Sequence, residues 1–227
     1  MLRVSLKVLA VAALVAGAPG LLDAQVFIPG ARPRAGSVEV SGGGMWTAGQ
    51  TLPSSAAVLT GNPGAGNASF DLFFSEPSLE PSLGAVGTVA VYLTPRIAIE
   101  GGLQFARPQL TVRLSDDFED APDVTASTTI TSYLFTGSLV YHFGNSPRTV
   151  PFMAAGAGHV RDVHTGNELV ETGMEYHGRG GVKLWFGPRR TAGLRLEGGL
   201  SLRDGGFSFD EGRRVVPSAA ASLVFLF

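Results

Sequence analysis

The sequence predicts an all-β fold, an eight-stranded antiparallel up-and-down β-barrel that crosses a membrane with its strands. Three observations lead to this prediction: apolar and polar residues alternate with a period of two, glycine occurs 31 times, often within these alternating stretches, and only 16% of the residues are charged. After the N-terminal segment, no apolar run approaches the roughly 20 residues that a membrane helix requires. Such a chain can cross a membrane only as a closed barrel, in which every backbone N–H and C=O pairs with a neighbouring strand.

The N-terminus has the composition of a secretory signal peptide. Arg3 and Lys7 supply the positive end, residues 8–17 form an apolar stretch, and residues 22–24 offer a cleavage site. An apolar stretch of about ten residues is too short to span a bilayer, which argues against the alternative of a membrane anchor. We expect a signal peptide at 1–24, a periplasmic N-terminal segment at 25–35 and an outer-membrane barrel at 36–227.

The composition excludes several classes of chemistry. The chain contains no cysteine, so it can form no disulfide framework, no thiolate metal site and no cysteine nucleophile. Its net charge of −2 gives no reason to expect a nucleic-acid partner. It also lacks a phosphate-binding glycine loop, a nucleotide fingerprint and a metalloprotease motif. We therefore expect no cofactor and no metal site.

The first four strands are predicted from their alternation and from the turns between them. The first strand, near 36–47, carries Val38 and Val40 on one face and Glu39 on the other. The segment 48–81 is rich in Pro, Ser, Gly and Asn and is predicted to be a long loop. The next three strands are expected near 83–93, 97–112 and 128–143, separated by a tight turn at 94–96 and an acidic loop at 114–125.

The facing of the second strand stays open at this point. Val89, Val91 and Leu93 are apolar, and so are Ala90 and Tyr92, which have the opposite parity. Because successive side chains of a strand point to opposite faces, only one of these sets can face the lipid. The alternation does not decide between them.

The last four strands are expected near 150–161, 173–186, 191–203 and 215–227, with short turns at 144–148 and 187–190. Alternation is clearest after residue 194, where leucines occupy one face and Arg195, Glu197 and Arg203 the other. Long and short connections alternate along the chain, as the outer loops and periplasmic turns of an outer-membrane barrel do. An even number of strands leaves both termini on the periplasmic side.

The polar faces of these strands carry four acids and four bases. In a barrel of eight strands the lumen is only wide enough for side chains to fill, and buried charges must pair there. The favoured interpretation is a salt-bridge network that plugs the barrel; the alternative is a gated conduit whose pairs rearrange. His142 and His177 are candidates for titration inside it. The predicted network consists of Glu39, Glu100, Glu175, Arg179, Lys183, Arg195, Glu197 and Arg203, centred on Arg179 and Arg195.

Four stretches resemble the OmpA-like (OmpX-like) superfamily of small outer-membrane barrels. They are Tyr92-Leu93-Thr94-Pro95-Arg96 with the strand that follows, residues 150–158, residues 181–189 with their return strand, and the terminal Leu-Val-Phe-Leu-Phe. The resemblance covers most of the chain after residue 82. It implies an eight-stranded barrel in the bacterial outer membrane. OmpA itself continues into a peptidoglycan-binding domain, whereas this chain stops at the barrel, so anchoring to the cell wall is not expected.

The resemblance also implies partners. The outer-membrane assembly machinery recognises a final strand that ends in an aromatic residue, and the last strand here presents Leu223, Phe225 and Phe227 on one face as the expected assembly signal. Outer-membrane lipid and lipopolysaccharide are the other expected partners, and the chain is expected to be a monomer. The acidic stretch 115–123 holds five carboxylates, which are expected to form a solvated surface loop; the alternative is that they collect divalent cations.

For function, the favoured hypothesis is a non-enzymatic barrel with a structural or surface-interaction role through its outer loops. One alternative is a narrow OmpW-like pore or lateral conduit for small hydrophobic compounds. A lipid A-modifying enzyme is disfavoured. Residues 161–167 resemble the Arg-x-x-His-x-Ser-Asn stretch of the lipid A deacylases, but Gly166 stands where the nucleophilic serine is required. A soluble periplasmic β-sandwich, with its apolar face inward, is the alternative from a different fold class.

Overall fold

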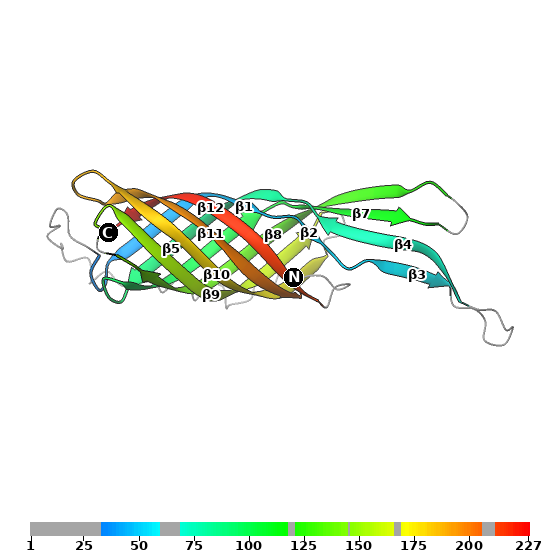
Figure 1. The fold of residues 1–227 in the computed structure, drawn as a ribbon, viewed down its shortest axis with the longest axis horizontal. Helices are drawn as coiled ribbons and strands as arrows, with labels where there is room; N and C mark the ends of the chain where they lie inside the picture. Colours follow the sequence, from blue (N-terminus) through cyan, green and yellow to red (C-terminus); the bar gives the residue numbers. More distant parts are fainter. Residues whose placement is uncertain (1–32, 60–68, 118–120, 145, 166–168, 206–211) are drawn as a thin grey trace, which may run out of the picture.

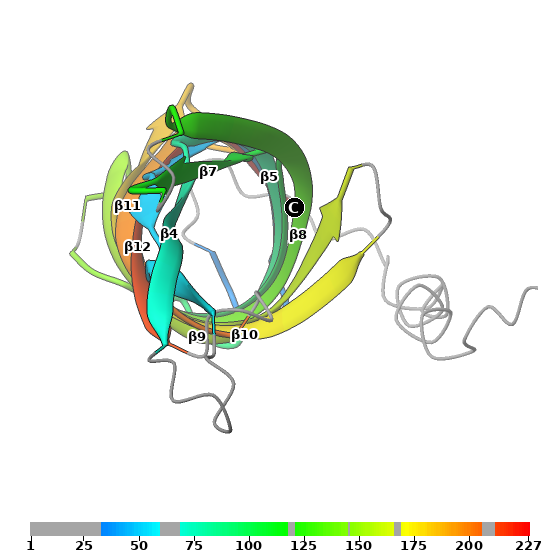
Figure 2. The same cartoon turned by 90° about the vertical axis from the view of Figure 1, so that its right-hand side faces the viewer.

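The chain forms a closed antiparallel β-barrel with a second, smaller sheet projecting from one end (Figures 1 and 2). The structure is a computed structural model that describes residues 33–59, 69–117, 121–144, 146–165, 169–205 and 212–227. The predicted signal peptide and most of the predicted N-terminal segment lie outside these residues. Within them, the barrel strands are β1 (Val38–Thr47), β5 (Ser82–Tyr92), β6 (Ile97–Ala106), β8 (Val124–His142), β9 (Thr149–His164), β10 (Val170–Phe186), β11 (Ala192–Gly205) and β12 (Arg213–Leu226).

The barrel closes without a break among these eight strands. Each pairs antiparallel with its neighbours in the order β8–β6–β5–β1–β12–β11–β10–β9, and β9 returns to β8. The first and last strands meet from Glu39 opposite Leu226 to Thr47 opposite Ser218. A closed barrel leaves no edge strand in its wall, which is the condition for crossing a lipid bilayer. The predicted fold class is confirmed.

Alternation places apolar side chains outside and polar ones inside. Leu139 on β8 is 56% exposed, whereas its neighbour Ser138 is 6% exposed, and the same contrast separates Leu223 from Ser222 on β12. This exposed apolar belt would be unstable in water and is what a lipid-facing surface requires. The soluble β-sandwich is therefore excluded, because its apolar residues would lie in the interior. The belt includes Val40, Val89, Ile99, Leu103, Phe135, Leu139, Met153, Tyr176, Leu200, Leu223 and Phe225.

The structure settles the facing of β5. Val89 and Val91 are about half exposed on the barrel exterior, whereas Ala90 and Tyr92 are each only 2% exposed. Tyr92 therefore points into the barrel, where its hydroxyl can meet polar groups. The sequence allows either set of residues to face the lipid. With Val89 and Val91 outside, the buried Tyr92 can satisfy its O–H with a polar group in the lumen.

The short turns, the start of β1 and the end of β12 all lie at the same end of the molecule. The backbone N–H of Val38 donates to the Phe227 carbonyl over 3.0 Å, and the Phe227 N–H donates to the Val38 carbonyl over 2.8 Å. In the turn between β5 and β6, the Thr94 hydroxyl accepts from the Arg96 and Ile97 N–H groups. This arrangement is that of periplasmic turns, so we refer to this end as the periplasmic end. The described residues contain no helix that is long and apolar enough to span a membrane.

The segment 48–81 is not simply a loop, and that prediction was wrong. It contains β2 (Gln50–Thr51), β3 (Ser55–Leu59) and β4 (Phe70–Leu79). These strands join β7 (Gln109–Ser115) and the first residues of β8 in a sheet that projects beyond the barrel (Figure 1). The strands are held mainly by backbone pairing, so the Pro and Ser residues within them did not prevent strand formation.

The predicted strand 97–112 is also divided in the structure. β6 ends at Ala106 and β7 begins at Gln109, with Arg107 and Pro108 between them. Proline has no N–H to donate to a ladder, so a strand readily ends there. The break lets β6 stay in the barrel wall while β7 pairs with β4 in the projecting sheet.

A small apolar core joins the projecting sheet to the barrel. Leu52, Leu79, Leu110 and Ile130 are buried together, with Ile130 at the point where β8 leaves its pairing with β9. Phe74 of β4 is not part of this core; it is 38% exposed and pairs with Ala56 of β3. The leucines therefore connect the sheet to the barrel.

Placing a charge in the apolar belt is expected to destabilise the barrel strongly. Leu103 lies on the outer face of β6, is 45% exposed and pairs with Phe135 in mid-wall. We expect Leu103→Arg to lower the free energy of unfolding from lipid vesicles by roughly 2–4 kcal/mol, because the guanidinium would lie in hydrocarbon. The control, Thr51→Arg in the exposed β2, should change it by less than about 0.5 kcal/mol. Equal effects in urea titrations of the two variants would contradict a lipid-facing belt.

Candidate functional site in the barrel lumen

The lumen near the periplasmic end holds a cluster built on Lys183. Its ammonium group donates to both carboxylate oxygens of Glu39, over 2.6 and 2.7 Å. The Tyr92 hydroxyl donates to the same carboxylate over 2.8 Å, and Lys183 Nζ lies 2.8 Å from His142 Nε2. Lys183 and Glu39 are each 1% exposed. We call Glu39, Tyr92, His142 and Lys183 the lower cluster; it joins β1, β5, β8 and β10.

The hydrogen bonds of His142 define its tautomer. Lys183 has only donors, so Nε2 of His142 must accept from it. The other ring nitrogen, Nδ1, lies 3.2 Å from the carbonyl oxygen of Arg96 and therefore carries the proton. A neutral imidazole of this kind orients the lysine towards Glu39 and adds no charge to the lumen.

A second cluster surrounds Arg195 in the middle of the lumen. Its guanidinium forms a bidentate pair with Glu100 of β6 and also donates to Glu197 from Nε and Nη2, over 2.9 and 2.6 Å. Arg179 of β10 lies 3.4 Å from Glu197 and 3.7 Å from Glu100. The Arg195 guanidinium lies 4.6 Å from the centre of the Phe152 ring, a distance typical of cation–π contact. We call Glu100, Arg179, Arg195 and Glu197 the middle cluster.

The two clusters form one network without net charge. Arg195 Nη1 lies 3.9 Å from Glu39 Oε1, which links the middle cluster to the lower one. The connected ionic groups are three acids and three bases, so the charges balance. Buried charges are tolerated when they are paired and most of their remaining hydrogen-bonding groups are satisfied. Here hydroxyl groups supply part of these contacts, while Nε of Arg179 has no hydrogen-bond partner among the described residues. Ser138 accepts from Arg179 over 3.0 Å, and Thr88 lies 3.5 Å from Arg195.

The remaining predicted pair lies towards the other end of the lumen. Arg203 donates to Glu175 over 2.8 Å, across the directly paired positions of β10 and β11. All eight predicted charged residues thus face the lumen, six of them in the connected network and two in this pair. His177 lies between the two groups, with Nε2 2.8 Å from Ser138 Oγ.

Sequence reasoning missed the polar residues that complete the network. Tyr92 belonged to a strand whose facing was open, and Thr88, Ser41 and Ser138 carry no charge that would mark them. Thr88 and Ser41 lie on neighbouring strands with their hydroxyl oxygens 2.7 Å apart. The alternation of side chains along each strand could have identified them, because Ser41 lies on the same face as Glu39 and Thr88 on the same face as Tyr92.

The stretch that resembles a deacylase motif is described only as far as Thr165. His164 is 8% exposed, and its Nε2 lies 2.7 Å from Glu171 Oε2, so this nitrogen already has an acidic partner. Gly166 and Asn167 lie outside the described residues. The acidic stretch 115–123 is described only in part; there, Asp123 accepts from Arg113 over 2.6 Å. Among the described residues, no group of three or more His, Asp or Glu side chains is placed to hold a metal ion.

The last strand presents its apolar residues outward, as its alternation predicts. Leu223 and Phe225 are 56% and 45% exposed on the outer face of β12, and Phe227 is 69% exposed at its end. Between them, Val224 and Leu226 point inward and are buried. The expected assembly signal is therefore a continuous apolar face, while its recognition by the assembly machinery stays a prediction.

Comparisons with known proteins agree with the fold. No protein-family model and no curated protein matches the sequence. Among solved structures, OprG, an outer membrane protein from Pseudomonas aeruginosa, has 12% identity and a TM-score of 0.54 over 86% of this chain and 97% of its own. Ail of Yersinia pestis, in complex with the heparin analogue sucrose octasulfate, has 10% identity and a TM-score of 0.47 over 85% and 99%. Neisserial surface protein A has 16% identity and a TM-score of 0.42 over 84% of this chain and 97% of its own.

At these sequence identities the likeness concerns the fold alone. The conclusion about the fold rests on the comparison with OprG. The bacterial outer membrane is the location that this fold and the outward apolar belt indicate. The chain has the fold of a small outer-membrane β-barrel.

Proposed function

We propose that this protein is a non-enzymatic outer-membrane barrel whose lumen is closed by its salt-bridge network and whose projecting sheet serves surface interactions. The observation that carries the proposal is the connected network of the lower and middle clusters. It takes side chains from β1, β5, β6, β8, β10 and β11, and Lys183, Arg195, Glu39 and Glu100 are each only 1% exposed. In a barrel of eight strands, side chains of this size are enough to fill the cross-section.

The closed wall argues against a lateral conduit. Every neighbouring pair among the eight barrel strands is hydrogen-bonded, including β1 with β12 and β8 with β9. A hydrophobic compound would have to part such a pair to leave sideways into the lipid, and this would leave backbone groups without partners in hydrocarbon. The projecting sheet, by contrast, extends the molecule well beyond the barrel (Figure 1). That position suits contacts at the cell surface.

The expected partners follow from this placement. The apolar belt would contact outer-membrane lipid, and the residues above it would contact lipopolysaccharide. Described acids of the outer end include Asp71, Asp116 and Asp123, so contact with lipopolysaccharide phosphates would require divalent cations between the two. The barrel is expected to act as a monomer, since its wall is complete within one chain.

Conductance measurements test whether the lumen is closed. In planar bilayers the purified protein is expected to give no stable conductance steps, because buried side chains of the network are enough to fill the lumen. Arg195→Ala removes the centre of the network and is expected to produce small steps or current noise. The control, Arg213→Ala, changes an arginine that pairs with Asp204 at the outer end and should remain silent. Stable steps from the unaltered protein that Arg195→Ala or Glu197→Ala abolishes or widens would support a conduit instead.

A further inference from the structure

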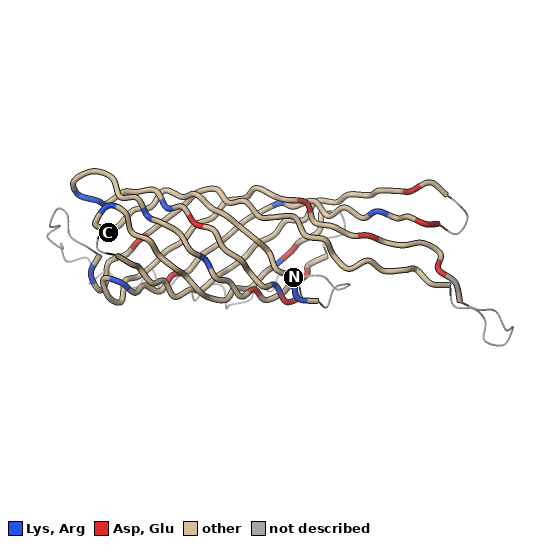
Figure 3. Tube along the Cα trace, viewed as in Figure 1, with Lys and Arg blue, Asp and Glu red and all other residues tan. Residues whose placement is uncertain are grey.

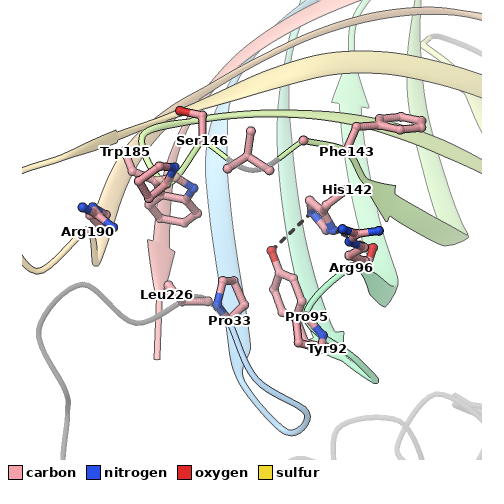
Figure 4. Close-up of a pocket in the computed structure, with 13 residues that line it drawn as sticks. Pro33, Tyr92, Pro95, Arg96, His142, Phe143, Ser146, Trp185, Arg190 and Leu226 are labelled. Atoms are coloured by element: carbon pink, nitrogen blue, oxygen red, sulfur yellow. Dashed lines mark hydrogen bonds between the residues drawn. The ribbon is translucent and has the colours of Figure 1, made fainter.

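The periplasmic mouth of the barrel contains a pocket that lies next to the lower cluster of the lumen network. The pocket has a volume of about 70 Å³ and lies between the short turns, with Arg96 and Arg190 on opposite sides (Figure 4). Since about 10–15 Å³ of such space holds one water molecule, the pocket could hold a small organic group. Its inner wall consists of Tyr92, His142 and Trp185, which are all buried.

The side chains of the described N-terminal segment and short turns at this end carry only positive formal charge. The arginines come from the N-terminal segment and all three short turns, and no Asp or Glu occurs in residues 33–37, 93–96, 143–144, 146–148 or 187–191. Figure 3 shows these arginines gathered at the end that bears the C-terminus, whereas most acids lie at or beyond the other end. A cleft lined by charge of one sign attracts ligands of the opposite sign. The arginines are Arg34, Arg96, Arg148, Arg189 and Arg190.

The two pocket arginines are suited to an anionic group. Among the described residues, the Arg96 guanidinium has no acidic partner, and its backbone carbonyl is held by His142 over 3.2 Å. Arg190 has a backbone φ of 53° and is half-buried at the wall of the pocket. Guanidinium groups bind phosphate and carboxylate through paired, charge-assisted hydrogen bonds. Lys183, which contacts His142 behind the pocket wall, is paired with Glu39 and adds no net charge.

The rest of the lining is apolar or aromatic. Trp185, which is 6% exposed, lines the pocket together with Val150 and Leu226. Ser146 lies at the edge with a hydroxyl that also accepts from the Thr149 N–H. Pockets that combine apolar walls with a few polar groups fix both the body and the orientation of a small ligand.

We propose that this pocket binds a small organic anion from the periplasm, with its phosphate or carboxylate between Arg96 and Arg190 and its apolar body against Trp185. The pocket borders the lower cluster, which supplies Tyr92 and His142 to its inner wall, and its occupation does not require an open lumen. A ligand there would cover the inner mouth of the barrel. Binding would weaken at high salt, because the arginines lie at the solvent-exposed end and ions screen them.

Tryptophan fluorescence gives a direct test. The chain has two tryptophans, and the other, Trp46, lies on the outer face of β1 and is 43% exposed. In a Trp46→Phe protein, held in zwitterionic detergent, Trp185 is the one remaining reporter. Phenyl phosphate and benzoate are the anionic probes, and phenol is the uncharged control. We expect saturable changes with at least one anion at concentrations where phenol gives none; comparison of the two anions then identifies the preferred charged group.

Variants in the same background identify the groups responsible. Arg96→Gln and Arg190→Gln are each expected to weaken binding of the anion about tenfold, the loss of one charge-assisted contact. The matched control, Arg213→Gln at the outer end, should leave it unchanged, and heat-modifiable gel mobility verifies that each variant is folded. Equal responses to phenol and the anions, no saturation with either anion, or folded arginine variants with unaltered affinity would overturn the proposal.

Discussion

Replacing Lys183 with methionine is expected to lower the free energy of unfolding by roughly 3–5 kcal/mol, the usual cost of removing one partner of a buried ion pair. The ammonium group contacts both oxygens of Glu39, and both residues are 1% exposed. Methionine has a similar length, so the loss would come from the unpaired carboxylate and not from a cavity. Arg195 Nη1, 3.9 Å from Glu39, already donates to Glu100, and Nε and Nη2 donate to Glu197, so this arginine cannot replace the lysine.

A double variant separates the pair from the packing. In Lys183→Met with Glu39→Gln, no unpaired charge remains, so we expect more than half of the lost stability to return. Arg113→Met, which removes an exposed pair with Asp123 in the projecting sheet, should cost less than about 1 kcal/mol. Urea titrations in lipid vesicles measure all of these values. If the double variant is as unstable as Lys183→Met alone, the charge of Glu39 is not what the lysine compensates.

The sequence was enough to predict that the charged residues of the strands face the lumen, because strand geometry fixes which side chains share a face. Side chains alternate strictly, so Arg195 and Glu197 must share a face once β11 is recognised as a strand. The same rule places Glu39 and Lys183 inside. A charge on a lipid-facing wall is expensive, and this leaves the lumen as the only acceptable place for all of them.

The partners within the lumen could not be predicted in the same way. Lys183 meets Glu39 although the two are 144 positions apart in the sequence, and their strands are not neighbours in the wall. Which side chains meet across the lumen depends on the stagger of the strands around the barrel. Alternation along one strand contains no information about that stagger, so the network could be predicted as a set of residues but not as a set of pairs.

The projecting sheet was missed for a different reason. Residues 48–81 have the composition of a loop, and β4 contains Pro77 within its pairing with β7. The carbonyl of Pro77 accepts from the Leu52 N–H over 3.0 Å, so proline here contributes an acceptor where its missing donor is not needed. Local composition underestimates a strand whose pairing is provided by distant segments.

The high glycine content gains a specific reason from the barrel wall, and it leads to a second large effect. We expect Gly156→Ala to destabilise the barrel by about 3 kcal/mol, at the upper end of what overpacking costs. A Cβ on Gly156 of β9 would lie 2.0 Å from the Gly137 carbonyl oxygen and 2.8 Å from the Ser138 Cα, both on the neighbouring strand β8. These are backbone atoms, so no side-chain rotation relieves the overlap, and β8 and β9 would have to separate.

Gly137 is the matched control, because it lies on the neighbouring strand at nearly the same position along the barrel. A Cβ there would meet nothing within 4 Å, since the residue faces outward. Gly137→Ala should therefore change the free energy of unfolding by less than about 0.5 kcal/mol. The folded fraction seen as heat-modifiable mobility, followed through a urea titration, compares the two variants directly. Equal urea midpoints for the two variants would refute the close approach of the two backbones. Gly156 would then be an ordinary strand position that any small residue could occupy.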